Sequence, residues 1–525
     1  MVPSTIFGSD DEGDAAAAMP YAEVAGLIAR FSACGMVGAV CYSASTAVIL
    51  GAVGTTLGSN AQVAYGIAQS LLCIAYIGSF IGICSVLQVR TSRAIAIDPT
   101  GERAALVMLR GYLFTIPVTI VTCAAAAVVL APLLIPVLWP GEVHQAHLHV
   151  GGGRKAAGVL PGAGTFDAEV RGMSATEQIV YTVWYSVPGC LVGAAAWTAE
   201  FSTLFEPETA LVSNAVALAA TYLAADAMVP HGLWAACLVP CVTFAVLWLG
   251  VVAMTNRRHP AWGRVLFSLG GARRPNLAPV LDARHLRNFA GVACRSALWQ
   301  IGNVSNSELA IVVVGPALAH ADLAAFNIIG SLLFVMWSVD EGILEGVGTV
   351  LSMQVGAATK GPRGGPWRVL LVGGLTSLVV TIAVAFAVGA NAGAVASMFT
   401  REVDVAASFE AAMVPLVILR VLSSIHELWG AAVKTIERSE VASVSTLCGT
   451  AAVVVGGIWA THRFGPTVSV VLWWWVAVLA AQLCYATVVS CFIDWQQAFS
   501  DAADLAPTES DTDDDVDAMP YAASV

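Results

Sequence analysis

The chain has 525 residues, of which 58% are hydrophobic and only 11% are charged, and its mean hydropathy is +0.77. This composition excludes a soluble globular protein and is typical of a protein that crosses a membrane many times. The net charge of -12 comes from two acidic ends, residues 1–20 and 495–525, which contain no Lys or Arg. We expect both ends to be disordered tails.

Twelve apolar runs are long enough to cross about 30 Å of hydrocarbon at about 1.5 Å per helical residue. The predicted fold class is therefore all-α, a polytopic membrane protein with twelve transmembrane helices. The runs lie near residues 21–51, 61–89, 104–137, 174–204, 208–229, 231–254, 286–314, 321–355, 367–390, 405–435, 440–461 and 467–493.

Basic residues indicate the orientation of these runs. Loops after even-numbered runs, with the starts of the next helices, carry sixteen Lys and Arg residues, and loops after odd-numbered runs carry five. Because basic residues concentrate in cytoplasmic loops, both termini are predicted to be cytoplasmic. The protein would be a multi-pass protein of the plasma membrane or of an organelle membrane.

An internal duplication is the next signal. A linker rich in Arg, Pro and Gly, 255–284, separates two predicted six-helix lobes, 21–254 and 285–494. Pro188 in the fourth run and Pro415 in the tenth each precede a glutamate by twelve residues, namely Glu200 and Glu427. Two six-helix halves with the same pattern suggest a transporter with its site between or within the lobes.

The loop 138–173 contains His144, His147 and His149, a spacing that is compatible with metal binding. No carboxylate or Cys frames these three residues, so a polar loop is the favoured interpretation. We therefore predict no metal site.

The seventh run carries a polar stripe and a carboxylate. Ser296, Gln300, Asn303 and Ser307 share one helix face, and Glu308 lies beside it. A carboxylate in hydrocarbon costs roughly 2.5–3.5 kcal/mol on insertion scales, so it normally faces a bundle interior or a wet cavity. Glu308 is predicted to bind a coupling cation, a proton or Na⁺. Gln300, Asn303 and Ser307 are predicted to line a substrate cavity. A permanent ion pair with a basic residue of another helix is the alternative.

Two further helices carry acids at membrane depth. In the tenth run Arg420 and Glu427 share a face, which is compatible with either a structural ion network or a proton site. The eighth run contains Asp340, Glu341 and Glu345, which are further candidates for binding the coupling cation, and the last two are four residues apart. Two like charges at that spacing repel each other, so a cation lies between them, one of them is protonated, or this helix end is solvated.

Three tryptophans complete the candidate residues. A cavity for organic cations is compatible with cation–π contacts from Trp299, Trp337 and Trp429. No Gly-x-x-x-x-Gly-Lys-Ser/Thr loop and no other enzyme signature occurs in the chain. We therefore expect a protein that is not an enzyme, uses no cofactor besides an ion gradient and binds no nucleic acid.

Four stretches of the second half are similar to one known family. They are Asn306-Ser-Glu-Leu-Ala-Ile-Val-Val-Val-Gly, Gly346 with Met353-Gln-Val-Gly-Ala, Met398-Phe-Thr-Arg-Glu-Val and Ile425-His-Glu-Leu-Trp-Gly. They resemble the multidrug and toxic compound extrusion (MATE) transporters of the wider multidrug, oligosaccharidyl-lipid and polysaccharide flippase (MOP) superfamily. The resemblance implies a two-lobe antiporter that exports organic cations in exchange for protons or sodium. It also implies that Glu308 and Glu427 bind the coupling cation.

The chain departs from the family pattern at several places. Asn303 stands where eukaryotic members often have Glu, the first run has no Asp, and the glycine-rich turn after the tenth helix is replaced by Glu437-Arg-Ser-Glu. Two alternatives stay open, a flippase of lipid-linked or polyanionic substrates and a non-transporting membrane scaffold or receptor. In each case the lipid bilayer is an expected partner. The antiporter would act as a monomer on a small organic cation.

Overall fold

The computed structural model describes residues 20–57, 59–98, 100–133, 175–259, 262, 283–357, 365–399 and 403–504. These residues are almost entirely helical and contain no strand. Eleven helices among them are long and apolar enough to cross a membrane. The predicted class, an all-α polytopic membrane protein, is confirmed.

The first lobe is built from the helices before the linker. They are α1 (Tyr21–Leu57), α2 (Ser59–Leu72), the π-helical turn η2 (Cys73–Ile77), α3 (Gly78–Ile97), α4 (Glu102–Ala125), the π-helical turn η3 (Ala126–Leu130), α8 (Ala175–Ser202), α9 (Pro207–Met228), the 3₁₀ turn η4 (Val229–His231) and α10 (Leu233–Arg258).

The second lobe follows the linker. Its elements are α13 (Ala283–Leu309), the π-helical turn η6 (Ala310–Val314), the 3₁₀ turn η7 (Gly315–Ala317), α14 (His320–Ala357), α15 (Gly365–Ala390), α16 (Ala392–Phe399), α17 (Val403–Ala411), α18 (Met413–Thr435), α19 (Ser439–Phe464), α20 (Val468–Phe492) and α21 (Trp495–Asp504).

The seventh predicted span, 286–314, is α13 with η6, and it is the one span that the count of eleven leaves out. Its polar stripe lowers its hydropathy. The helix nevertheless packs along α3 and α19, inside the bundle. Neighbouring helices shield its polar face, which is why a helix of this composition can lie among the apolar spans.

The two lobes touch chiefly where α1 packs on α14 and α3 packs on α13, and α3 also contacts α14 while α1 contacts α15. Small residues allow this close approach: a side chain on Gly342 of α14 would collide with the backbone of Gly35 and Met36 in α1. At the second crossing, a Cβ on Gly78 of α3 would lie 2.7 Å from the Cα of Ile301 in α13. At both crossings the helix backbones are in direct contact. Bulky side chains fit between the lobes only at some distance from these two points.

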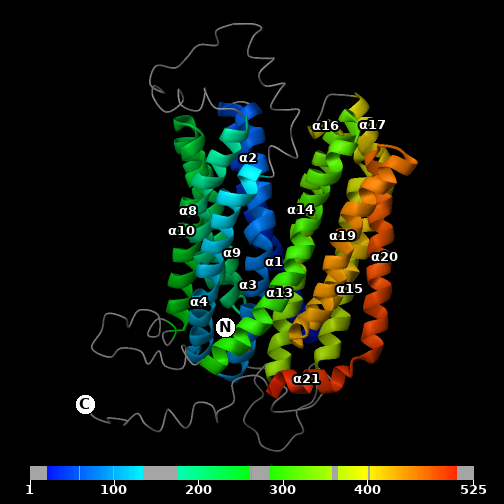
Figure 1. Ribbon diagram of the computed structural model, residues 1–525. Helices are drawn as coiled ribbons and strands as arrows, with labels where there is room; N and C mark the ends of the chain where they lie inside the picture. The colour runs from blue at the N-terminus through cyan, green and yellow to red at the C-terminus, as the bar shows by residue number, and fades with distance from the viewer. Residues whose placement is uncertain are drawn as a thin grey trace, which may run out of the picture.

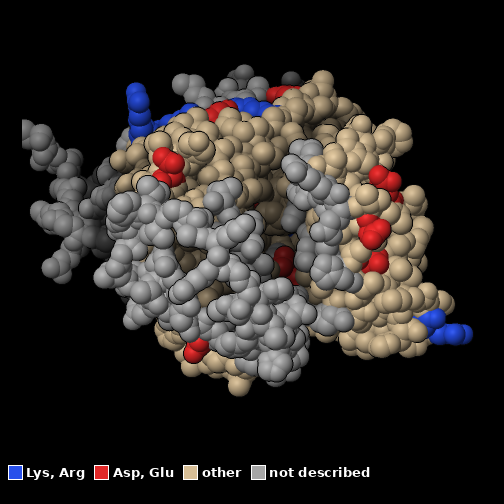
Figure 2. Space-filling view, turned by 90° about the horizontal axis from the view of Figure 1, so that it is seen from above, with Lys and Arg blue, Asp and Glu red and all other residues tan. Residues whose placement is uncertain are grey.

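The lobes diverge toward one end of the bundle. At one end, which we call the terminal face, α21 lies across the second lobe; at the other, the open face, α16 and α17 lie and the lobes are farther apart (Figure 1). Seen from the open face, the surface is hollowed between the lobes, and an acidic side chain lies deep in the hollow (Figure 2).

Two predicted boundaries are wrong. The run 405–435 is two helices, α17 and α18, because Pro415 has no N–H to donate to the carbonyl of Ala411 and the helix breaks at Ala412. The tail predicted to begin at residue 495 begins later, since α21 buries Ala498, Phe499 and Ala502 on one face. The histidine-containing loop 138–173, most of the linker 255–284 and the acidic ends 1–19 and 505–525 lie outside the described residues.

Candidate functional site: a buried ionic network in the second lobe

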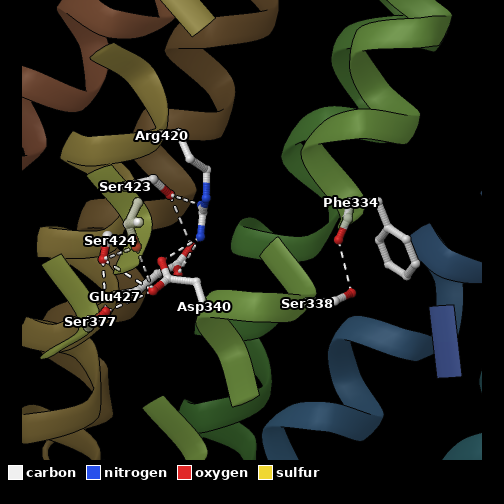
Figure 3. A network of polar contacts seen from close by, with 9 residues as sticks. Phe334, Ser338, Asp340, Ser377, Arg420, Ser423, Ser424 and Glu427 are labelled. Carbon is white, nitrogen blue, oxygen red and sulfur yellow. Dashed lines mark hydrogen bonds and ion pairs between the residues drawn. The ribbon is translucent and has the colours of Figure 1, made fainter. Parts of the chain in front are cut away.

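Asp340 of α14 lies at the centre of a polar cluster inside the second lobe (Figure 3). Its side chain is 1% exposed. Its Oδ1 accepts hydrogen bonds from Ser377 Oγ at 2.7 Å and Thr381 Oγ1 at 3.0 Å, both from α15, and from Ser424 Oγ of α18 at 3.3 Å. Three neutral hydroxyls therefore solvate one oxygen of a carboxylate that water hardly reaches.

The other oxygen of Asp340 meets a guanidinium. Arg420 Nη2 of α18 lies 2.5 Å from Asp340 Oδ2 and 3.5 Å from Glu427 Oε2, two turns further along the same helix. Ser423 bridges the last two residues: Arg420 Nη1 donates to its Oγ at 3.1 Å, and that hydroxyl donates to Glu427 Oε1 at 3.0 Å. The Arg420–Glu427 contact is therefore present, and it is compatible with both interpretations made from the sequence, a structural ion network and a proton site.

The charges of this network do not balance. Asp340, Arg420 and Glu427 are 1%, 3% and 5% exposed, so two carboxylates share a single buried guanidinium. Asp340 has the shorter ion pair and three hydroxyl donors. Glu427 Oε2 has no hydrogen-bond donor among the described residues. Since an uncompensated buried charge is costly, Glu427 is the place where one added positive charge would be most stabilising.

Glu341 and Glu345 point to a second cation. Both side chains are half-buried and interact electrostatically with Lys434, near the end of α18. The Lys434 ammonium lies 4.8 Å from the ring centre of Trp299, in cation–π geometry. Lys434 stands at the end of the tenth apolar run, where a basic residue is expected to be a loop cation, but its charge acts on both carboxylates, which is one of the arrangements expected from their spacing.

Glu308 lies elsewhere. It ends α13, its carboxyl group is within hydrogen-bonding reach of Ser70 in α2, and Cys73 of the turn η2 lies beside it. Two arginines at membrane depth pair elsewhere: Arg295 pairs with Glu440 at 3.4 Å, and Arg420 is part of the Asp340 network. The structure does not bring Glu308 together with Glu427. The π-helical turns η2 and η6, a feature common at functional sites, adjoin it.

The predicted cavity residues are divided among three places. Gln300 is buried near the crossing of α13 with α3, and Asn303 and Ser307 are half-buried further along α13. Trp299 and Trp429 pack together inside the second lobe. Trp337 stacks on Phe334 with ring centres 5.8 Å apart. Phe334 and Ser338 lie on the side of α14 away from Asp340 (Figure 3), and Ser338 hydrogen-bonds to Ser43 of α1.

No protein-family model and no curated protein matches this chain. Solved structures do match. The eukaryotic MATE transporter AtDTX14 has a TM-score of 0.69 at 13% identity, over 93% of this chain and all of that one. The Vibrio cholerae MATE transporter VcmN in its bent form has a TM-score of 0.62 at 14% identity, over 92% of this chain and 98% of that one. The chain has the MATE fold. The resemblance seen in the sequence is confirmed at this level.

A third match widens the functional range of the MATE fold. A MOP superfamily transporter from Pyrococcus furiosus, for which a reversed polarity of the binding pocket suggests a different function, has a TM-score of 0.64 at 14% identity, over 95% of this chain and 98% of that one. Proteins with this fold can therefore differ in function when the charges that line their binding pockets differ. Among the described residues, no group of three or more His, Cys, Asp or Glu side chains could hold a metal ion.

Sequence reasoning missed two residues of this MATE-fold site. Ser377 and Thr381 stand four apart in the very apolar helix α15 and share the face that meets Asp340. Two hydroxyls at helical spacing in an apolar run are a visible signal of a buried polar partner. The sequence could not show which helix supplies that partner.

Proposed function

We propose that this chain is a secondary active antiporter, which exports organic cations in exchange for protons or sodium by alternating access. The observation that supports this proposal is the charge count of the buried network: Asp340 and Glu427 share one guanidinium, that of Arg420. A site that lacks one positive charge favours uptake of a cation. Glu427 is the binding residue, Asp340 anchors Arg420, and Glu308 is a second, separate coupling carboxylate beside η2.

The substrate would enter from the open face. Phe334 is exposed and stacks on Trp337 at the edge of α1, so the pair offers aromatic faces to a cation between the lobes. The basic residues predict that the terminal face is cytoplasmic, and the structure drawn in Figure 1 then corresponds to an outward-open state. We expect the protein to work as a monomer without a cofactor.

A flippase of polyanionic or lipid-linked substrates is the second candidate, because a MOP relative with reversed pocket polarity shares the fold. Such a substrate requires unpaired cations in the cavity. Arg295 and Arg420 already contact Glu440 and Asp340. The observed pairing favours the cation exporter.

The test is transport of a fluorescent organic cation in proteoliposomes, driven by a pH gradient or a sodium gradient. We expect gradient-driven transport by the wild type and a loss of its gradient dependence in Glu427→Gln. Glu200→Gln is the matched control, because Glu200 follows Pro188 as Glu427 follows Pro415 but contacts Asn214 instead of an arginine. Wild-type coupling in Glu427→Gln would refute the role of Glu427. No gradient-driven flux of any cation by the wild type would refute the antiporter.

A further inference from the structure

The turn between α18 and α19 contains a strained residue. Glu437 has φ 57°, and it is the one non-glycine residue with positive φ in the described part of the chain. This left-handed conformation favours glycine. A long charged side chain at such a position indicates that its contacts offset the backbone strain.

Those contacts reach the other lobe. Arg90 of α3 holds both oxygens of Glu437, with Nε 3.2 Å from Oε1 and Nη2 2.9 Å from Oε2, and Arg93 Nη1 lies 3.2 Å from Oε1. Burial by itself would raise the pKa of Glu437, but the two arginines outweigh it and hold this pKa below its usual range. The carboxylate is therefore ionised at neutral pH and fully paired across the lobe boundary.

Arg93 does more than pair with Glu437. Its side chain is fully buried, and it donates to the carbonyl oxygen of Thr435, the last residue of α18, and at 3.0 Å to that of Ala502 in the last turn of α21. Cations near the carboxyl ends of helices satisfy free carbonyls and oppose the helix dipole. One arginine of the first lobe thus binds the ends of two helices of the second.

The turn is packed on one side, where Ile436 lies in the apolar core that also contains Ile95 of α3, and is open on its outer side. A cavity of about 300 Å³ borders the turn, and its lining includes Asn288, Arg295, Glu440 and Asp501. Of the charged side chains around the cavity, Arg295 and Glu440 pair with each other. The polar contacts of Arg90 and Arg93 join α3 to the turn there, beside the apolar packing of Ile436.

We propose that Arg90, Arg93 and Glu437 form an interlobe lock that holds the terminal face closed and must break before the lobes can separate there. Its consequence for transport rests on the proposed alternating access, but the lock itself is a conformational element that needs neither substrate nor gradient. Breaking it shifts the population toward a state open at the terminal face.

The first lobe offers a matched control. The corresponding turn between α8 and α9 carries Glu206, which is also buried, and lies 2.9 Å from His259 Nε2 and 3.6 Å from Arg258 Nη1. These partners belong to the same lobe. Glu206→Gln therefore removes a comparable buried carboxylate without touching the lobe boundary.

The experiment is hydrogen–deuterium exchange of the full chain in lipid nanodiscs, without substrate. In Glu437→Gln and Glu437→Gly we expect amide exchange at the end of α3, in the turn and in α21 to rise about tenfold or more, the factor that loss of one charge-assisted hydrogen bond implies. Glu206→Gln should leave these three segments at the wild-type rate. Gln keeps the backbone strain and Gly removes it, so a shared response assigns the effect to the carboxylate.

Wild-type exchange in these segments for either Glu437 variant would overturn the lock, as would an equal rise in Glu206→Gln. If both Glu437 variants fail to fold, Arg90→Gln is the second test, because Arg90 is partly exposed and Arg93 remains in place. We then expect a smaller rise in the same three segments, and no rise would overturn the proposal. Since no transport is measured, failure of the lock and failure of the antiporter are separate results.

Discussion

The two lobes carry a glutamate at the same position of their repeats but surround it differently. Glu200 in α8 accepts a hydrogen bond from Asn214, a neutral partner, whereas Glu427 in α18 shares Arg420 with Asp340. Among the described residues, the Glu200 site therefore contains no ion pair. In the second lobe, by contrast, two carboxylates share one guanidinium, and binding of one cation would balance these charges.

The opposing helices differ in the same sense. The two halves can be aligned on Ser70-Leu-Leu and Ser331-Leu-Leu, which sets Ser79 and Phe80 of α3 against Asp340 and Glu341 of α14. Phe80 is fully buried and stacks on Trp197 at 5.4 Å. Where the second lobe has an ion network, the first has a packed aromatic core. A packed core resists deformation, whereas the charge balance of an ion network changes when a cation binds. This contrast favours coupling in the second lobe.

The largest expected effect of breaking this contrast is that of Arg420→Met. Removing the only guanidinium leaves Asp340 and Glu427 facing each other, and loss of one partner of a buried pair costs about 3–5 kcal/mol. Unfolding in a mild detergent, followed by tryptophan fluorescence, measures this loss. Asn214→Ala in the first lobe removes a neutral hydrogen-bond donor to Glu200 and should cost about 1–3 kcal/mol. Equal losses in the two lobes would contradict the difference between them.

A double-mutant cycle sharpens the same point. Asp340→Asn combined with Arg420→Met should be less destabilising than the sum of the single variants, with a coupling energy of about 0.5–3 kcal/mol, because the pair lies at 2.5 Å. The same unfolding measurement applies. Additive effects would mean that the hydroxyls of α15 and α18, and not Arg420, stabilise Asp340.

The fold was predictable because hydropathy, charge bias and repeats are properties of single segments. The second lobe's site was predictable only in part. Glu427 and Arg420 share one helix, so their proximity follows from spacing. The position of Asp340 at the centre of the site was not predictable, because no local pattern shows that α14, α15 and α18 meet around it.

Residues near helix ends were the hardest to assign. Arg93 and Lys434 stand at the ends of apolar runs, where a sequence pattern predicts solvated loop cations, yet Arg93 is 1% exposed and Lys434 interacts with Glu341 and Glu345. Their burial depends on partners far along the chain. Such contacts between segments far apart carry no signal in a single sequence.

The aromatic residues test where the substrate binds. We expect Trp337→Ala to weaken binding of a fluorescent organic cation by about 0.5–2 kcal/mol, because it removes one cation–π face at the lobe boundary. Trp429→Phe is the control, since the Trp429 indole donates to Ser490 at 3.0 Å within the second lobe. Fluorescence titration measures both affinities. A greater loss in Trp429→Phe would move the substrate site into the second lobe's interior.

The smallest expected effect, and the sharpest for the number of coupling sites, is that of Glu308→Gln. The glutamine can still hydrogen-bond to Ser70, and the network at Glu427 stays intact, so transport should remain gradient-driven. If Glu308 binds a second coupling cation, fewer cations cross per cycle, and the reversal potential of transport in proteoliposomes shifts accordingly. An unchanged reversal potential would exclude Glu308 from coupling. Coupling would then be assigned to the Asp340–Arg420–Glu427 network alone.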